Sequence, residues 1–281
     1  MSSGRAGSFR EFAEEIRERN RYETGAFRGW FGFGPVGWLR SFCFHVRVLL
    51  VYVVARKSIR RGTFDLEAYG GRSFASLRAV EGAGGKVLVT GLEHLASVPG
   101  PVVFVGNHMS TLETLLLPGL ILPFKDVAFV VKESLLQYPV FGPIMRSVKH
   151  IAVGRANPRD DLKVVLTRGQ EMLQSGISVV IFPQATRSAV FDVSAFNSLG
   201  VKLASKAGVP VIPVALKTDF MGNGRVFKDL GYIDNRKVVQ IAFGAPLAAS
   251  ATGREAHEAV VEWVGSHLRE WGGEIRIQEG V

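Results

Sequence analysis

The sequence of 281 residues predicts an α/β fold with a single mixed sheet flanked by helices, preceded by an N-terminal membrane-associated helical element. Two observations predict this fold. Short β-rich runs alternate with helical patterns from Gly85 onward, and several runs are continuously apolar, as expected for strands covered on both faces. The segment before residue 62 is instead basic and apolar. We expect strands over residues 86–92, 101–107, 126–132, 150–154, 178–182, 210–216 and 237–244.

Two of the helices that accompany these strands have recognisable starts. Asn157 and Pro158 supply an N-cap and a first-turn proline, and apolar residues then recur at helical spacing up to Gly176. Near the C-terminus, Thr252 and Glu255 form a capping box ahead of a second amphipathic pattern. The sequence contains no internal repeat and no long linker, so the strands and helices belong to one domain.

The formal net charge of +9 is concentrated near the N-terminus. Residues 24–61 contain seven arginine or lysine residues and no acidic residue. The sequence has neither zinc-finger spacing nor the signature of an RNA-recognition module, so it does not predict nucleic-acid binding. A basic block joined to an apolar run is typical of contact with anionic phospholipids. We therefore expect a membrane surface as partner, a membrane-associated helical region over residues 1–61 and a catalytic-type domain over residues 62–281.

The apolar run from Trp38 to Ala55 has about the minimum length that spans a bilayer. Its leucine, phenylalanine and valine residues favour insertion, but Arg47 near the middle offsets most of that gain. Upstream, residues 25–38 supply aromatic rings and glycines suited to the headgroup zone. We expect a monotopic helical hairpin in one leaflet, with arginine side chains reaching lipid phosphates. A single spanning helix and an ordinary buried core helix are the alternatives.

The N-terminus and the cysteine content indicate the compartment. The first 21 residues carry both charge signs and no apolar core, so they do not resemble a secretory signal. Cys43 is the single cysteine, so no intramolecular disulfide forms, which fits a reducing compartment. We therefore expect the protein at the cytoplasmic face of the cell membrane, attached peripherally.

A histidine and an acid at the end of the predicted strand over 101–107 are the main candidates for chemistry. His108 follows that strand directly, and Glu113 follows five residues later. A carboxylate can fix the tautomer of an imidazole so that the other ring nitrogen takes a proton. No GxSxG motif supplies a protein nucleophile, so the activated hydroxyl would belong to the substrate. His257 and Glu262 have the same spacing, but within a helix they point about 140° apart and cannot form such a dyad. A structural histidine is the alternative for His108.

Four sequence blocks within residues 86–245 together resemble the motifs of a known family. They are NHMSTLE (107–113), KESLL headed by Lys132 with VFGPIMRSVKHIAVGR ending in Arg155, FPQATRS (182–188) and VPVIPVAL (209–216). In this order they resemble the 1-acylglycerol-3-phosphate (lysophosphatidate) acyltransferase family, glycerolipid acyltransferases in which a histidine and an aspartate lie five positions apart. The resemblance implies fatty acyl transfer from acyl-CoA or acyl carrier protein to the free hydroxyl of 1-acylglycerol-3-phosphate, making phosphatidate. It implies no cofactor or metal, because the acyl thioester is a co-substrate.

Residue roles follow from the same resemblance. His108, oriented by Glu113, is expected to remove a proton from the acceptor hydroxyl as that oxygen attacks the thioester carbonyl, without an acyl-enzyme. Asn107 is expected to orient the loop that carries His108. The Arg187 guanidinium matches phosphate oxygens, with a surface ion pair as the alternative, and turn capping is the alternative for the neighbouring hydroxyl residues. The residues expected to bind the acceptor are Lys132, Arg155, Gln184, Thr186, Arg187 and Ser188.

The sequence departs from the family pattern at two places. Glu113 stands where the family has aspartate, which keeps the charge and adds a methylene. Gln184 and Ala185 stand where the family has glutamate and glycine, which removes a charge from the block assigned to the acceptor phosphate. These departures keep two other interpretations open. One is the same chemistry on another lyso-lipid, and the other is a membrane lipid-binding relative that has lost turnover.

Overall fold

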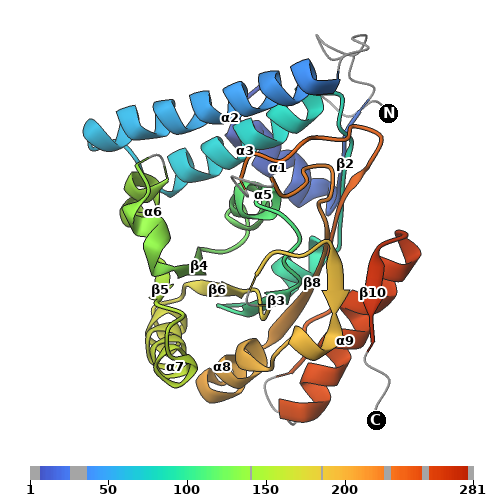
Figure 1. Cartoon of the computed structure of the whole chain (residues 1–281). Coiled ribbons are helices and arrows are strands. Elements are labelled where there is room, and N and C mark those ends of the chain that lie inside the picture. Colours follow the sequence, from blue (N-terminus) through green and yellow to red (C-terminus); the bar gives the residue numbers. More distant parts are fainter. Residues whose placement is uncertain are drawn as a thin grey trace.

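The computed structural model describes residues 7–25, 37–139, 141–184, 186–224, 229–248 and 253–277. Eight strands of this part of the chain form one sheet in the order β1-β2-β9-β8-β3-β6-β4-β5 (Figure 1). β3 is parallel to both of its neighbours, and β4 and β5 run the same way, whereas β9 is antiparallel to β8. The predicted α/β fold with a mixed sheet is confirmed. The strands are β1 (Tyr22–Glu23), β2 (Val87–Thr90), β3 (Val103–Gly106), β4 (Val127–Lys132), β5 (Ile151–Val153), β6 (Ser178–Ile181), β8 (Val211–Lys217) and β9 (Val239–Phe243).

All seven predicted strands are present, each within two residues of its expected bounds. Three strands were not predicted. β1 pairs antiparallel with β2 at the edge of the main sheet. β7 (Val190–Asp192) and β10 (Glu274–Arg276) pair with each other in a separate two-stranded sheet. These strands are two or three residues long, too short to show the alternation by which a strand is recognised in a sequence.

Helices cover both faces of the sheet (Figure 1). The strand β3 accordingly buries apolar side chains on both of its faces. Phe104 packs into the apolar core on one side, and Val103 and Val105 pack into the core on the other, because successive side chains of a strand point to opposite faces. One face is covered by α1 (Phe9–Arg19), α2 (Gly37–Arg60), α3 (Leu66–Gly82) and α5 (Leu112–Ile121), and the other by α7 (Pro158–Gln174), α8 (Leu199–Ala207) and α9 (Gly253–Glu270). The shorter elements are α4 (Glu93–Ser97), η1 (Glu133–Gln137), α6 (Gly142–Ser147) and η2 (Val193–Ala195).

The sequence predicted where two helices begin, and the structure tests one of these predictions in full. The Asn157 side chain accepts a hydrogen bond from the Arg159 backbone N–H, and α7 begins at Pro158, so this N-cap is confirmed. α9 begins at Gly253. Thr252 lies outside the described residues, so its capping box with Glu255 stays a prediction.

The residues before α2 take part in the main core. Ser8 caps α1 in a capping box, and this orients Phe12 and Ile16 into the core. The Tyr22 hydroxyl, at the start of β1, donates to a carboxylate oxygen of Glu81 on α3 at 2.6 Å. The division of the chain at residue 61 stays a prediction, because α1, β1 and one face of α2 pack on the core that the later residues form.

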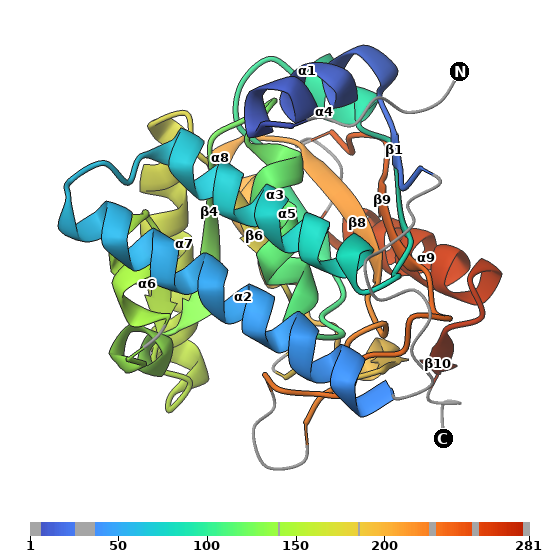
Figure 2. The same cartoon turned by 90° about the horizontal axis from the view of Figure 1, so that it is seen from above.

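The predicted apolar run from Trp38 to Ala55 lies within α2, which is long and apolar enough to cross a membrane. One face of α2 packs beside α3 (Figure 2), with Phe44, Val48 and Tyr52 buried there. The opposite face is a continuous row of exposed apolar side chains, which we name the apolar stripe. It consists of Trp38, Leu39, Phe42, Val46, Leu49, Leu50, Val53 and Val54.

Two polar residues within α2, His45 and Arg47, contact protein groups outside the apolar stripe. His45 Nε2 lies 2.8 Å from the Gly231 carbonyl oxygen, and the Arg47 guanidinium lies against Gly82 at the C-terminal end of α3. The C-terminal end of a helix attracts a positive charge, so the end of α3 stabilises the Arg47 guanidinium without a lipid phosphate. α2 packs beside the largely buried α3, and the hairpin predicted within one leaflet stays a prediction. The upstream arm predicted over 25–38 lies almost entirely outside the described residues.

Candidate active site

The candidate residues gather where five strands end on one edge of the sheet. β3, β6, β8, β4 and β5 are parallel, so their carboxyl ends share that edge, which is where ligands bind in sheets of this kind. The sequence continues from these ends into His108 after β3, Gln184, Thr186 and Arg187 after β6, Thr218 after β8, Arg155 after β5 and, at the last residue of β4, Lys132.

The predicted His108–Glu113 pair is in contact. The turn after β3 brings α5 back so that Glu113, in the first turn of that helix, reaches the imidazole. His108 Nδ1 lies 2.9 Å from Glu113 Oε1. The histidine side chain is 14% exposed and the glutamate side chain is fully buried. The carboxylate therefore faces Nδ1 and leaves Nε2 as the ring nitrogen that can take a proton.

The Glu113 carboxylate is enclosed by hydrogen-bond donors. Oε1 accepts from the backbone N–H groups of Met109 at 2.6 Å and Ser110 at 2.9 Å. Oε2 accepts from the hydroxyls of Thr218 at 2.6 Å and Ser110 at 3.1 Å. Burial raises the pKa of Glu113, but the hydrogen bond and charge of His108 and the bond from Thr218 outweigh it, and the pKa is lowered. An ionised Glu113 accepts the Nδ1–H of His108 and fixes that tautomer.

The FPQATRS block contacts His108 through one aromatic ring and two hydrogen bonds. The imidazole stacks on the Phe182 ring, with centroids 4.5 Å apart and planes 7° from parallel. The buried Gln184 side chain accepts the His108 backbone N–H through Oε1 at 2.8 Å. The His108 carbonyl accepts the Ser188 backbone N–H at 2.9 Å. Gln184 can do this without a charge, because an amide oxygen and a carboxylate oxygen both accept one N–H.

Asn107 fastens the end of β3 to β8. Its side-chain Nδ2 donates to the Leu216 carbonyl at 2.7 Å, and its Oδ1 accepts the Leu216 backbone N–H at 2.9 Å. The residue is buried, so both ends of its amide are satisfied by the backbone. The loop that carries His108 is thus anchored on one side by Asn107.

Arg187 already has a negative partner. Its Nη1 lies 2.5 Å from Asp229 Oδ1 and also donates to the Thr111 hydroxyl, which in turn donates to Asp229 Oδ1 at 2.7 Å. The Arg187 and Asp229 side chains are 18% and 31% exposed. The ion pair named as the alternative for Arg187 is therefore present. Neither Asp229 nor Thr111 was singled out from the sequence.

A second guanidinium lies near Arg187. The backbone at Arg155 is left-handed, with φ of 61°, and its N–H donates to Asp161 Oδ2 at 2.9 Å. Burial is the largest cause that lowers the pKa of Arg155, Asp161 opposes it, and the positive charge of Arg187 lowers it further. Two positive groups from β5 and β6 are thus within electrostatic reach of each other.

The other predicted acceptor ligands are less closely joined to the dyad. Lys132 is exposed at the end of β4, two strands away from β3. Thr186 is exposed, and the Ser188 hydroxyl accepts the Val190 backbone N–H at 3.1 Å, which is the turn-capping alternative. Ala185 lies outside the described residues. The acceptor-binding roles of Lys132, Thr186 and Ser188 stay predictions.

Thr218 was missed from the sequence. It is fully buried and directly follows β8, and it gives Glu113 its shortest side-chain hydrogen bond. A signal was available, because a hydroxyl residue just after an apolar strand at the carboxyl edge of a parallel sheet faces the site. Among the described residues, no group of three or more histidine, cysteine or acidic side chains is arranged to hold a metal ion.

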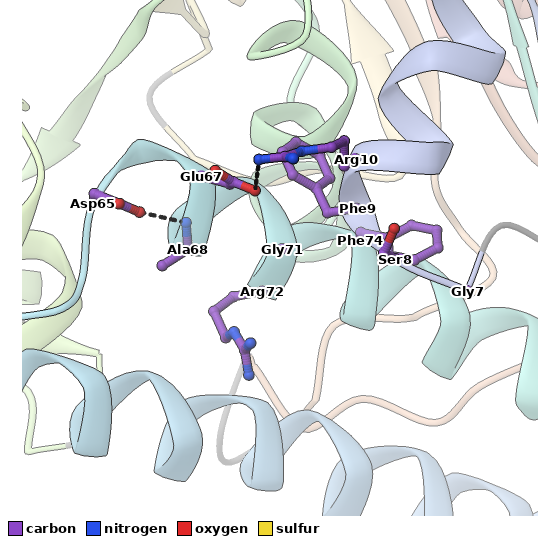
Figure 3. Close-up of a pocket in the computed structure, with 10 residues that line it drawn as sticks. All are labelled: Gly7, Ser8, Phe9, Arg10, Asp65, Glu67, Ala68, Gly71, Arg72 and Phe74. Atoms are coloured by element: carbon purple, nitrogen blue, oxygen red, sulfur yellow. Dashed lines mark hydrogen bonds and ion pairs between the residues drawn. The ribbon is translucent and has the colours of Figure 1, made fainter.

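A pocket of about 450 Å³ lies away from these residues, between α1 and the start of α3 (Figure 3). Part of its polar lining already has partners, whereas Nε of Arg72 is buried without a hydrogen-bond partner among the described residues. Asp65 accepts the Ala68 backbone N–H at 2.8 Å as the N-cap of α3, and Arg10 and Glu67 form an ion pair at 3.6 Å. The pocket is therefore a junction between two helix starts, and we assign it no part in the chemistry.

Comparisons with known proteins identify the family of the chain. The Acyltransferase family model matches residues 86–217. A 1-acyl-sn-glycerol-3-phosphate acyltransferase of Pseudomonas aeruginosa is 32% identical over 192 residues, which cover 67% of this chain and 71% of that protein. The chloroplastic 1-acyl-sn-glycerol-3-phosphate acyltransferase LPAT1 of Arabidopsis thaliana is 34% identical over 141 residues, but these cover 37% of that protein.

A solved structure supports the fold. The crystal structure of PlsC, a 1-acyl-sn-glycerophosphate acyltransferase of Thermotoga maritima, matches with a TM-score of 0.65 and 21% identity, covering 86% of this chain and 98% of that one. The matched family and relatives make this protein an acyltransferase. More narrowly, the chain belongs to the 1-acyl-sn-glycerol-3-phosphate acyltransferase family.

Proposed function

We propose that the protein transfers a fatty acyl group from a thioester to the free hydroxyl of 1-acylglycerol-3-phosphate, making phosphatidate. The observation that carries the proposal is the 2.9 Å contact between His108 Nδ1 and the buried carboxylate of Glu113. With Nδ1 protonated, Nε2 accepts the hydroxyl proton while the oxygen attacks the thioester carbonyl. The C–S bond then breaks, and the thiol leaves with the proton that the imidazolium returns. Neither an acyl-enzyme nor a metal takes part.

The acceptor phosphate fits the positive groups at the ends of β5 and β6. Arg187 presents a planar guanidinium, and the nearby Arg155 adds a second positive charge. Family membership supports the same acceptor, because the relatives are named for 1-acyl-sn-glycerol-3-phosphate. Lys132, Thr186 and Ser188 complete the proposed acceptor-binding set, with Gln184 acting through the His108 backbone.

The donor is an acyl thioester, either acyl-CoA or acyl carrier protein. The basic residues of the N-terminal region suit the acidic carrier protein, although lipid competes for the same charges. Both donors present the same thioester carbonyl to the acceptor hydroxyl, so the proposed mechanism is the same for each.

A different lyso-lipid acceptor is the second candidate. Two observations favour it, namely the uncharged Gln184 in the FPQATRS block and the pairing of Arg187 with Asp229. A relative without turnover is disfavoured by the dyad, in which the buried Glu113 carboxylate binds Nδ1 of the partly exposed His108 and leaves Nε2 available.

The deciding experiment offers several lyso-lipids with each of the two donors and measures the products by mass spectrometry. Phosphatidate as the main product supports the proposal, and the faster donor identifies the physiological thioester class. Preferential acylation of a lyso-lipid with another headgroup would replace the proposed acceptor. If no combination turns over, the protein is a lipid-binding relative instead.

Membrane association through α2 completes the proposed function. The apolar stripe is exposed along the helix while the opposite face is packed on α3, which favours a monotopic helix that lies along one leaflet. Basic residues at the C-terminal end of the helix, including Lys57, Arg60 and Arg61, suit anionic phospholipid headgroups. The proposed location is the cytoplasmic face of the cell membrane, which the single cysteine supports.

Vesicle sedimentation with matched variants tests this attachment. Leu50→Ser with Val53→Ser removes two side chains of the apolar stripe, and Val164→Ser with Ile277→Ser removes two exposed apolar side chains elsewhere. Burial of each such side chain in lipid contributes about 1.5–3 kcal/mol, so the stripe variant should bind anionic vesicles at least about tenfold more weakly. Equal binding by both variants would locate the membrane surface away from α2.

A further inference from the structure

Arg187, which is proposed to hold the acceptor phosphate, forms an ion pair with Asp229 in this structure. Arg187 Nη1 meets Asp229 Oδ1 at 2.5 Å, and Thr111 bonds to both partners. A carboxylate and a phosphate are both oxyanions that a guanidinium binds in the same way. An acceptor phosphate that binds Arg187 must therefore compete with Asp229.

The Arg187–Asp229 pair differs from an ion pair that holds the fold together. Arg78 and Glu81 form such a structural pair, in which Glu81 is 2% exposed and also accepts from the Tyr22 hydroxyl. Asp229 is 31% exposed and its hydrogen bonds within the described chain go to Arg187 and Thr111, both at the site. Breaking a part-exposed pair is inexpensive, because water replaces the lost partner.

The segment that carries Asp229 also touches the membrane-facing helix. His45 Nε2 lies 2.8 Å from the Gly231 carbonyl oxygen, and Ser41 Oγ accepts the Ile233 backbone N–H at 3.1 Å. Between these contacts, Leu230 and Tyr232 are 59% and 60% exposed. Asp229 thus belongs to a segment that contacts both α2 and the site.

We propose that Asp229 is an internal counter-ion that occupies Arg187 until the phosphate of the acceptor displaces it. The proposal rests on the phosphate-binding role of Arg187 proposed above. Displacing Asp229 weakens the binding of every phosphate by the same factor. A lyso-lipid offsets this loss through its acyl chain, whereas a soluble phosphate ester has nothing to offset it. Asp229 therefore lowers the affinity of Arg187 for every phosphate, so that acceptor binding depends mainly on the acyl chain.

The test compares Asp229→Asn with Asp234→Asn in the full-length protein. Asp234 lies in the same connection between β8 and β9 and pairs with Arg236, so its substitution changes the net charge equally at a distance from the site. Asp229→Asn should lower KM for 1-acylglycerol-3-phosphate by about 3- to 10-fold. It should also lower the concentration of glycerol 3-phosphate that half-inhibits the reaction by a similar factor. Asp234→Asn should change neither value.

The sign of the change decides between the counter-ion and its alternatives. A higher KM in Asp229→Asn would mean that Asp229 positions Arg187 for phosphate, and an unchanged KM with unchanged inhibition would make the pair structural. Either result overturns the proposal. Unchanged melting temperature keeps a folding defect from being read as a binding effect.

Arg187→Ala separates a failure of this inference from a failure of the proposed function. If Arg187→Ala leaves KM unchanged, Arg187 does not bind phosphate and both proposals fail. If it raises KM while Asp229→Asn does not lower it, the counter-ion alone fails. In the double variant the gain from Asp229→Asn should disappear, because its benefit depends on the arginine that it releases.

Discussion

Two acid–base pairs lie at the same edge of the sheet and differ in almost every physical respect. Glu113 is fully buried, and its two oxygens accept hydrogen bonds from His108, the loop backbone and Thr218. Asp229 and Arg187 are both partly exposed and are held mainly by each other and by Thr111. A general base needs one fixed geometry, whereas a ligand-binding cation has to exchange partners. The degree of enclosure around each carboxylate therefore supports the proposed division between a part of the site that performs chemistry and a part that binds.

The largest expected effect is at the enclosed pair. His108→Ala should lower kcat by about 10²–10⁴, the usual contribution of a general base, with little change in the melting temperature because the imidazole is partly exposed. Steady-state kinetics with 1-acylglycerol-3-phosphate measures this change. Near-normal turnover in a folded variant would exclude the dyad as the catalytic group and remove the basis of the comparison.

Loss of the orienting charge should have the next largest effect. Glu113→Gln keeps the shape but cannot hold the imidazolium, and kcat should fall by about 10²–10³. Glu113→Asp restores the aspartate of the family pattern. Its kcat should fall less than that of Glu113→Gln, because the negative charge remains and only the length of the side chain is reduced. Equal activity of all three proteins would show that Glu113 does not orient His108.

The exchangeable pair should respond through KM instead. Arg187→Ala removes a charge-assisted contact of roughly 1.5–3 kcal/mol, so KM for a phosphate-bearing acceptor should rise about 10- to 150-fold with a smaller change in kcat. Arg187→Lys should recover part of this loss, since an ammonium cannot reproduce the planar fork. A fall in kcat without a rise in KM would place Arg187 with the enclosed pair and contradict the contrast drawn above.

The smallest effect on rate is expected at Thr218. Thr218→Val removes the 2.6 Å hydrogen bond to Glu113, and kcat should fall by about 3- to 10-fold because the backbone donors still hold the carboxylate. The free energy of unfolding at neutral pH should fall by about 1.5–3 kcal/mol, the contribution of a hydrogen bond to a charged group.

The stability change in Thr218→Val should depend on pH in a defined direction. The folded-state pKa of Glu113 is lowered from its ordinary value of 4.5, so its ionised form stabilises the fold above that pH, and the stabilisation is lost as the pH falls through the folded-state value. Removing Thr218 raises that pKa. The difference in unfolding free energy between wild type and variant should therefore shrink in acid, and a pH-independent difference would mean that the bond does not act on the ionised carboxylate.

The sequence was sufficient for the enclosed pair and insufficient for the exchangeable one. His108 and Glu113 are close in the chain, and the strand and helix that hold them have clear patterns, so local reasoning placed them correctly. Thr218 and Asp229 lie more than a hundred residues further along the chain, and only the sheet order brings them to the site. No pattern within one segment reports such a contact.

The same distinction applies to α2. Its residues are apolar on both sides, so composition predicted a membrane-associated helix but not which side would be exposed. Packing against α3 decides this, because it buries Phe44 and Val48 and turns Arg47 towards the end of that helix. The sequence therefore indicated the element, and tertiary contacts determined its orientation.

If α2 lies along a leaflet as proposed, its exposed face also determines which concentration governs the rate. A helix of 24 residues is about 36 Å long, and one that lies along a leaflet confines the protein to a two-dimensional film of lipid. Within that film the enzyme encounters its acceptor according to the mole fraction of lyso-lipid, not the amount per litre. Inert phospholipid added at constant total acceptor therefore slows the reaction by surface dilution. Under this proposal, turnover in the cell follows the local enrichment of lyso-lipid in the leaflet that holds α2.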